Sequence, residues 1–243
     1  TAKSGFTYFY VRNENAGTTT VTSVSVRELP GNHATQSTTA SRPTLSARVN
    51  LLTKTEQFDD AVWQGAGETT TANNTIAPNG TQTADRITET VDNGTHCKFQ
   101  SFTFQPSTTY SASFCWKKGT RRWVWITFQT DSIPATQLAQ FFDLDNGVLG
   151  SNNTGAGGTQ ASRVSASITS LGDGWYRCSL AVKFGSAVSA GSSTGVFTGL
   201  SSADNVNSYV GTPNDYNWVW GADLRVANES ANLPAYQRVN TDT

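Results

Sequence analysis

Short alternating segments separated by tight-turn dipeptides constrain this chain to an all-β fold. Apolar and polar residues alternate within each segment, as expected for strands with one buried face. The turn signals are Asn79-Gly80, Asn93-Gly94, Asn146-Gly147 and Asp173-Gly174. Such pairs are typical of two-residue hairpin loops. No segment has a long amphipathic helical period, so the pattern predicts an antiparallel β-sandwich or jelly roll.

The first part of the chain has a different composition from the rest. Residues 30–48 (PGNHATQSTTASRPTLSAR) show no strand periodicity and contain two prolines, which predicts a linker. Residues 1–29 contain two strand-like runs, too few to be stable alone. We expect them to form the C-terminal hairpin of an upstream β module, or to dock on the main sheet or a neighbouring subunit. Residues 49–226 are then the sandwich module and residues 227–243 a terminal connector.

Charge excludes some classes of partner. Only 14% of the residues are charged and the formal net charge is -1. A nucleic-acid-binding surface needs a basic footprint, which this composition does not supply. No apolar run has the length needed to cross a bilayer. We therefore expect neither a nucleic-acid partner nor insertion into a membrane.

Cysteine and histidine are too few and too scattered for a metal or redox site. Cys97, Cys115 and Cys178 are odd in number and widely spaced, and His33 lies far from His96. This pattern predicts no disulfide framework, no metal site and no cofactor. Reduced thiols agree with assembly in a cytoplasm.

The acidic residues show no pattern typical of a glycosidase. A hydrolase needs two carboxylates facing each other across a cleft. Those available are Glu56, Asp59, Asp60, Asp85, Glu89, Asp143 and Asp145. Most lie in turns or beside strand ends, so we predict that the chain is not an enzyme, with a glycan hydrolase or lyase as a less favoured alternative. The run 143–147 (DLDNG) begins like a calcium loop but lacks its terminal Glu, which favours a hairpin turn.

The tryptophans are the best candidates for a binding surface. In residues 121–128 (RRWVWITF), alternation puts Trp123 and Trp125 on the face opposite the aliphatic side chains, beside Arg121. A tryptophan ring can stack on the apolar face of a pyranose while polar neighbours bind its hydroxyls. Packing of that face under another sheet, loop or subunit is the alternative.

Two further strands contribute to this hypothesis. In residues 174–184 (GWYRCSLAVKF), the face opposite the predicted core carries Trp175, Arg177 and Lys183. In residues 218–224 (WVWGADL), alternation predicts that Trp218 and Trp220 share the core face with the following aliphatic residues. The candidate carbohydrate-binding residues are Arg121, Trp123, Trp125, Trp175, Arg177 and Lys183.

Several segments together resemble a known group of proteins. They are NLLTKTEQFDDAVW, APNGTQTADRITE, TYSASFCWKKGTRRWV, FFDLDNGVLGS, SITSLGDGWYRCSLAV and WVWGADLRV. In this order they resemble β-sandwich modules of bacteriophage tail-fibre and other virion proteins, which are similar to carbohydrate-binding jelly rolls. The resemblance covers residues 50–226, and GDGWYRCS and WGADL are its most specific parts.

The resemblance implies a non-catalytic virion module. Such a module is attached to a longer, often trimeric fibre or to an adsorption apparatus. We expect it to assemble with other virion modules in the host cytoplasm and to bind a cell-surface polysaccharide through its exposed aromatic face. No binding residue carries over from the group, because its ligands vary. Two alternatives remain: an accessory carbohydrate-binding module of a secreted polysaccharide-degrading enzyme, and a structural spacer.

Overall fold

The computed structural model describes residues 20, 50–130, 136–153, 161–186, 195–227 and 235–240. The chain divides into two units, Thr1–Ser46 and Ala47–Thr243, and every described residue except Thr20 belongs to the second. The predicted N-terminal hairpin and linker therefore lie, apart from Thr20, outside the described residues.

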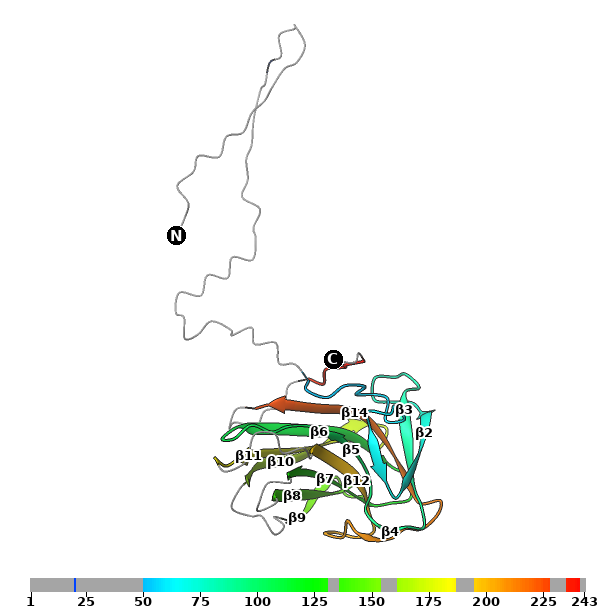
Figure 1. The fold of residues 1–243 in the computed structure, drawn as a ribbon. Helices are drawn as coiled ribbons and strands as arrows, with labels where there is room; N and C mark the ends of the chain where they lie inside the picture. Colours follow the sequence, from blue (N-terminus) through cyan, green and yellow to red (C-terminus); the bar gives the residue numbers. More distant parts are fainter. Residues whose placement is uncertain are drawn as a thin grey trace. The chain divides into compact units, whose positions relative to one another are not determined.

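Two six-stranded antiparallel sheets form the second unit (Figure 1). Sheet A contains, in spatial order, β1 (Gln64–Ala66), β5 (His96–Ser101), β12 (Gly195–Ser201), β7 (Trp123–Thr130), β8 (Thr136–Asp143) and β9 (Val148–Asn153). Sheet B contains β10 (Ala161–Gly172), β11 (Trp175–Phe184), β6 (Thr109–Lys118), β14 (Tyr216–Val226), β3 (Ala84–Glu89) and β2 (Glu68–Thr75). A two-stranded sheet joins β13 (Tyr209–Val210) to β4 (Asn93–Gly94). In these ranges no helix is long and apolar enough to cross a membrane.

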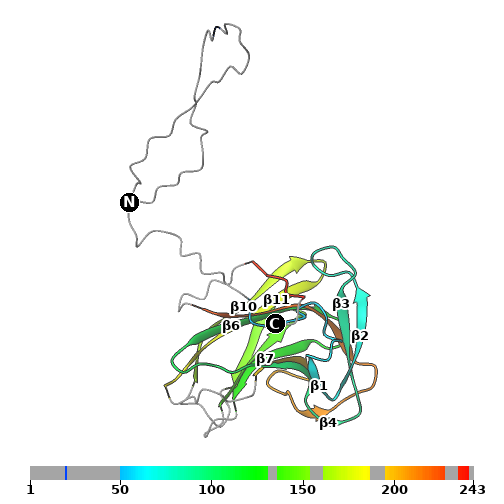
Figure 2. The ribbon, with the colours of Figure 1, turned by 45° about the horizontal axis from the view of Figure 1, so that its top comes forward.

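The strand order is that of a jelly roll. Its eight main strands, in chain order, are β3, β5, β6, β7, β8, β11, β12 and β14. If these strands are numbered from one to eight along the chain, their spatial order is 1, 8, 3, 6 in sheet B and 2, 7, 4, 5 in sheet A. Each sheet is thus built from strands far apart in the chain, as two Greek keys require. The predicted all-β sandwich is confirmed, and Figure 2 shows the sheets from a second direction.

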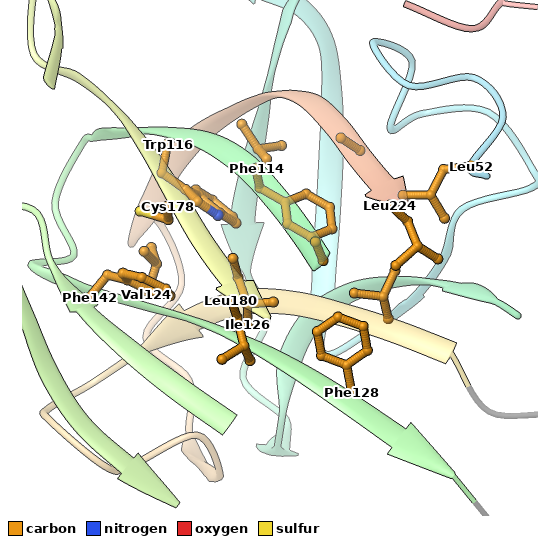
Figure 3. Packing of buried hydrophobic residues seen from close by; sticks show 14 of the residues in the cluster. Leu52, Phe114, Trp116, Val124, Ile126, Phe128, Phe142, Cys178, Leu180 and Leu224 are labelled. Carbon is orange, nitrogen blue, oxygen red and sulfur yellow. The ribbon is translucent and has the colours of Figure 1, made fainter. Parts of the chain in front are cut away.

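The core lies between the inner faces of the two sheets. Val124, Ile126 and Phe128 of β7 are fully buried there, as the alternation predicted. They pack with Phe114 and other side chains of β6 (Figure 3). The indole N–H of Trp116 donates to the Thr198 hydroxyl across the sandwich at 3.0 Å. Burial of large apolar side chains is therefore the main stabilising contribution to this unit.

A β-bulge in β14 corrects the prediction for the C-terminal tryptophans. The pairing of β14 with β6 shifts between Trp220 and Asp223, next to Gly221 at φ 65°. A bulge inserts one residue and so reverses the alternation beyond it. Ala222 and Leu224 therefore join the core, whereas Trp220 lies in a cluster on the outer face of sheet B. The sequence placed both tryptophans in the core, and this was wrong.

The predicted turns are confirmed at Asn79-Gly80, Asn146-Gly147 and Asp173-Gly174, and the one at Asn93-Gly94 is wrong. Asp173 and Gly174 connect β10 to β11 with φ values of 50° and 78°. Two consecutive positive φ values are the signature of a type I′ hairpin, which Asp-Gly favours. Asn93-Gly94 instead forms strand β4, paired with β13. A turn dipeptide thus does not exclude pairing when a distant strand lies alongside.

Candidate functional site

The outer face of sheet A carries a second apolar surface. A buried cluster, separate from the core, consists of Cys97, Trp125, Ala139 and Phe141, with Ala66, Trp123 and Phe197 packed against it. Phe99 lies on the same face because it pairs with Phe197. We call Phe99, Trp123, Trp125, Phe141 and Phe197 the outer aromatic surface. Sheet A is thus apolar on both faces, which is unusual for a sheet with one side toward water.

The centre of the outer aromatic surface is closed to solvent. Trp125 is only 1% exposed, and its indole N–H donates to the carbonyl oxygen of Leu200 at 2.9 Å. Its register partner Phe141 is completely buried. The predicted parity of Trp125 is confirmed, because it faces away from the core. The expectation that it is exposed was wrong, since its ring packs into a cluster on that face.

One end of the surface remains accessible. Phe99 and Phe197 are partly exposed and stack with ring centroids 4.4 Å apart and planes 15° apart. Gln64 is the register partner of Phe99 on edge strand β1, and its side-chain amide donates to the Ser101 hydroxyl at 3.2 Å. Both of these polar residues are exposed. Aromatic carbon and amide and hydroxyl groups therefore meet at one edge of sheet A.

A groove of about 600 Å³ adjoins this edge. Its lining includes Gln64, Ser101, Phe102 and Gln100. Gln100 is held in place because its side-chain oxygen accepts from the Thr53 amide at 2.9 Å and its amide donates to the Thr53 carbonyl at 3.0 Å. The groove thus shares Gln64 and Ser101 with the edge that carries Phe99, and it has both polar and apolar lining residues.

Trp123 marks the other end of the surface. It pairs with Ser201, while Phe197 of the same strand pairs with Thr127. Four residues separate these positions along β12, or roughly 13 Å at the usual strand rise. Trp123 is partly exposed, and the Arg122 guanidinium lies 5.1 Å from its ring centroid. A ligand that touched both ends would have to be longer than a single small ring.

The charge of Arg122 is already matched. Its guanidinium donates to both carboxylate oxygens of Asp143, at 2.9 and 2.6 Å. These bonds hold the pKa of Asp143 far below its ordinary value, with further bonds from Asn146 and the backbone. Asp143 also accepts from the backbone N–H of Asp145 and Asn146, so residues 143–147 form a turn. In the described ranges no group of three His, Cys, Asp or Glu side chains is arranged for a metal ion.

Trp175 lies on the other sheet. It begins β11 in sheet B, is 2% exposed, and donates its indole N–H to the Ile76 carbonyl at 3.1 Å. It packs with Cys115 and Trp220 on the outer face of that sheet. The expectation of one exposed face shared by Trp123, Trp125 and Trp175 was therefore wrong. Alternation assigns a residue to a face of its strand, but it does not say which sheet the strand joins.

The predicted basic residues are also dispersed. Arg177 donates to the Ser113 hydroxyl at 3.0 Å, and Lys183 is exposed at the far end of the same strand. Arg121 instead holds two loops together. Its guanidinium donates to both oxygens of Glu89 at 2.7 Å and lies 3.1 Å from Asp215.

Glu89 is fixed as an anion inside this arrangement. Burial raises its pKa, but bonds from Arg121, the Tyr209 hydroxyl and the Thr212 amide outweigh burial and lower the pKa below its ordinary value. Hydrogen bonding to the charged form has this effect. Arg121 is therefore part of the framework and is not free to hold a ligand.

Sequence reasoning missed the most accessible aromatic pair. Phe99 and Phe197 come from segments far apart in the chain, HCKFQS and GVFTGLS. Nothing in either segment indicates that it pairs with the other, and only the pairing of β5 with β12 brings the rings together. The exposed positions beside Phe99, namely Gln64 and Ser101, were missed for the same reason.

No protein-family model matches this chain, and no curated protein matches it at the level required of a relative.

Proposed function

We propose that this chain is a non-catalytic module of a bacteriophage virion protein, such as a tail fibre or adhesin, that binds carbohydrate on the surface of the host cell. The observation that carries the proposal is the accessible end of the outer aromatic surface, where Phe99 and Phe197 stack beside exposed Gln64 and Ser101. The jelly-roll sandwich and the resemblance of residues 50–226 to virion modules support the same conclusion.

The chemistry of this end suits a sugar ring. Phe197 covers one face of Phe99, so the face left for a ligand is the one toward Gln64 on the neighbouring strand. A pyranose stacked there would place its hydroxyls near the Gln64 amide and the Ser101 hydroxyl. Apolar stacking with a few convergent polar groups is the usual design of a small-molecule site.

The acidic residues favour binding over hydrolysis. Several of those considered as catalytic candidates have structural partners. Glu89 is bound by Arg121, Asp143 by Arg122, and Asp85 by the backbone amides of Phe58 and Asn73. A glycosidase needs two carboxyl groups open to the substrate on either side of the bond it cleaves.

The thiols favour assembly in a reducing compartment. Cys97, Cys115 and Cys178 are free and buried. We therefore propose that the module assembles with other virion modules in the host cytoplasm. On the virion it would then be part of a fibre that forms a homotrimer.

Binding to a panel of purified bacterial surface polysaccharides, followed by calorimetry with the best member, tests the proposal. Phe99→Ala should weaken binding by about 1–3 kcal/mol, the range for an aromatic hot spot. Val210→Ala is the matched control, because Val210 is 64% exposed and lies on β13, outside sheet A. The proposal fails if no polysaccharide binds, or if Phe99→Ala and Phe197→Ala both bind as tightly as the unaltered protein.

A further inference from the structure

Cations and aromatic rings alternate in one row across the outer face of sheet B. The row runs over four neighbouring strands in the order Trp175, Lys117, Trp218, Arg86. Lys117 faces outward because Phe114 and Trp116, of opposite parity in β6, are in the core. Register partners share a face, so the other three side chains stand on the same side.

Lys117 is a cation without a partner in the described part of the chain. It is partly exposed and has no carboxylate within ion-pair distance among those residues. It lines a groove of about 530 Å³ together with Trp175, Ile76, Leu171 and Asp173. Ile76 and Leu171 are 52% and 43% exposed, so the groove presents apolar surface next to an ammonium group.

Arg86 is the second such cation. Its guanidinium lies 5.3 Å from the ring centroid of Tyr216, and its Nε atom is buried with no hydrogen-bond partner. A buried donor without a partner is costly, and a guanidinium donates well to an anionic oxygen. Among the described residues no carboxylate forms an ion pair with Arg86. The Nε atom is out of a ligand's reach, so the donors left for a ligand are the terminal nitrogens of the guanidinium, which are not among the buried unpartnered atoms.

Several other cations of this unit have carboxylate partners. Ion pairs join Lys98 to Glu68, Lys118 to Asp145, Arg121 to Glu89, Arg122 to Asp143, Arg225 to Asp223 and Arg238 to Glu56. Against this background, two cations that lie in one row without carboxylate partners among the described residues point to an anionic ligand.

Trp218 lies between the two cations. It is partly exposed, its indole N–H donates to Asn74 at 2.8 Å, and its ring meets Tyr216 edge-on at 5.0 Å. Lys117 and Arg86 are two strands apart, which separates their backbones by about 10 Å. The spacing suits an extended ligand that carries an anionic group on either side of an apolar ring.

We propose that this row, Trp175, Lys117, Trp218 and Arg86 with Tyr216, is a second binding surface that takes an acidic polysaccharide. Carboxylates of neighbouring uronic acid residues would meet Lys117 and Arg86, and a pyranose face would lie against Trp218. Asp173 on the groove wall would accept from a sugar hydroxyl. A phosphate polymer fits less well, because the chain has a net charge of -1 and no extended basic patch accompanies the two cations. The proposal does not depend on the outer aromatic surface of sheet A.

The test is a titration of the whole chain with an oligomer of galacturonic acid, followed by NMR of the indole N–H groups and by calorimetry. We expect the Trp218 and Trp175 signals to shift, and binding to weaken as salt is added. Lys117→Gln and Arg86→Gln should each weaken binding about tenfold, because each removes a charge-assisted contact. Lys118→Gln is the matched control, since Lys118 is adjacent in sequence but paired with Asp145; it should bind as the unaltered protein does.

Phe99→Ala separates this proposal from the one for sheet A, because it should leave binding of the galacturonic acid oligomer unchanged. The inference is overturned if the indole signals do not move in the unaltered protein, if both glutamine variants bind normally, or if Phe99→Ala abolishes binding. It is also overturned if a linear polyphosphate of equal charge binds more tightly than the oligomer, since charge alone would then account for the effect. The indole readout on the unaltered protein holds even if Arg86→Gln unfolds.

Discussion

The two outer faces of this sandwich differ in their charge. On sheet A the outward side chains form an aromatic surface, and the nearby Arg122 is neutralised by Asp143. On sheet B the outward row contains Lys117 and Arg86 without carboxylate partners in the described ranges, separated by Trp218. One fold thus presents a neutral aromatic surface and a cationic aromatic surface on opposite sides. The difference comes from strand register, which decides which distant residues become neighbours.

The largest expected effect tests whether the outer aromatic surface is a closed cluster. Trp125→Ala should destabilise the protein by about 3–5 kcal/mol, because it removes a buried ring and the bond to Leu200. Trp123→Ala, on the same face but partly exposed, should cost about 1 kcal/mol. Urea unfolding measures both. Equal and small costs would mean that the centre of the surface is open in solution, and the contrast between its centre and its ends would disappear.

The next largest effect is expected from the buried carboxyl group of Asp85 in sheet B. Asp85 is buried on the inner side of β3, and burial raises its pKa to about 6 despite bonds from the amides of Asn73 and Phe58. The folded state therefore binds a proton more readily than the unfolded chain, whose Asp has a pKa of 3.8. The stabilisation due to protonated Asp85 is complete below about pH 4 and is lost as the pH rises through 6, a change of about 3 kcal/mol.

Asp85→Asn isolates this contribution. Its destabilisation relative to the unaltered protein should be larger at pH 4 than at pH 7, by up to about 3 kcal/mol. Urea unfolding at the two pH values gives the difference, and a carboxyl NMR titration gives the pKa directly. A difference of the opposite sign would show that the backbone bonds, and not burial, dominate at Asp85.

The smallest expected effects are on the reactivity of the three thiols, which lie in three different parts of the sandwich. Cys97 lies on the outer face of sheet A, Cys115 on the outer face of sheet B, and Cys178 in the core. Burial raises the pKa of Cys97 to about 11 and that of Cys115 to about 12, and it raises the pKa of Cys178 as well. The thiolate is the reactive form, so all three should react slowly with a thiol reagent in the folded protein.

Mass spectrometry after alkylation would count these thiols. Three should be modified after unfolding without reductant, and none at an early time in the folded state. Fast modification of Cys97 alone would show that the outer surface of sheet A opens more readily than that of sheet B. A single modified thiol after unfolding would reveal a disulfide and would contradict assembly in a reducing compartment.

The inner face of the sandwich could be predicted from sequence more fully than the outer faces. Alternation placed Val124, Ile126 and Phe128 correctly, because burial on one side leaves a local signal. It failed in β14, where one extra residue reverses the pattern after Trp220. It also could not show that Trp123 and Trp175 belong to different sheets, since sheet membership depends on pairing between distant segments.

The candidate sites depend on the same distant pairings. The stacking of Phe99 on Phe197 and the order of Lys117, Trp218 and Arg86 exist only once the strands are in register. Each of these residues was visible in the sequence, but nothing local indicated its neighbours. Of the candidate residues chosen from single strands, Trp125 and Trp175 proved to be buried for that reason.

The position of β14 has a consequence for the order of events during synthesis. This strand comes late in the chain, yet it lies between β6 and β3, which emerge from the ribosome much earlier. Until it arrives, the facing edges of β6 and β3 lack the partner that joins them. We expect the nascent sandwich to stay incomplete until residues near 226 are available, and to close in a late, slow step, because long-range β pairing has a high entropic cost. We therefore expect the pairing of β14 with β6 and β3 to be the step that limits the rate of folding.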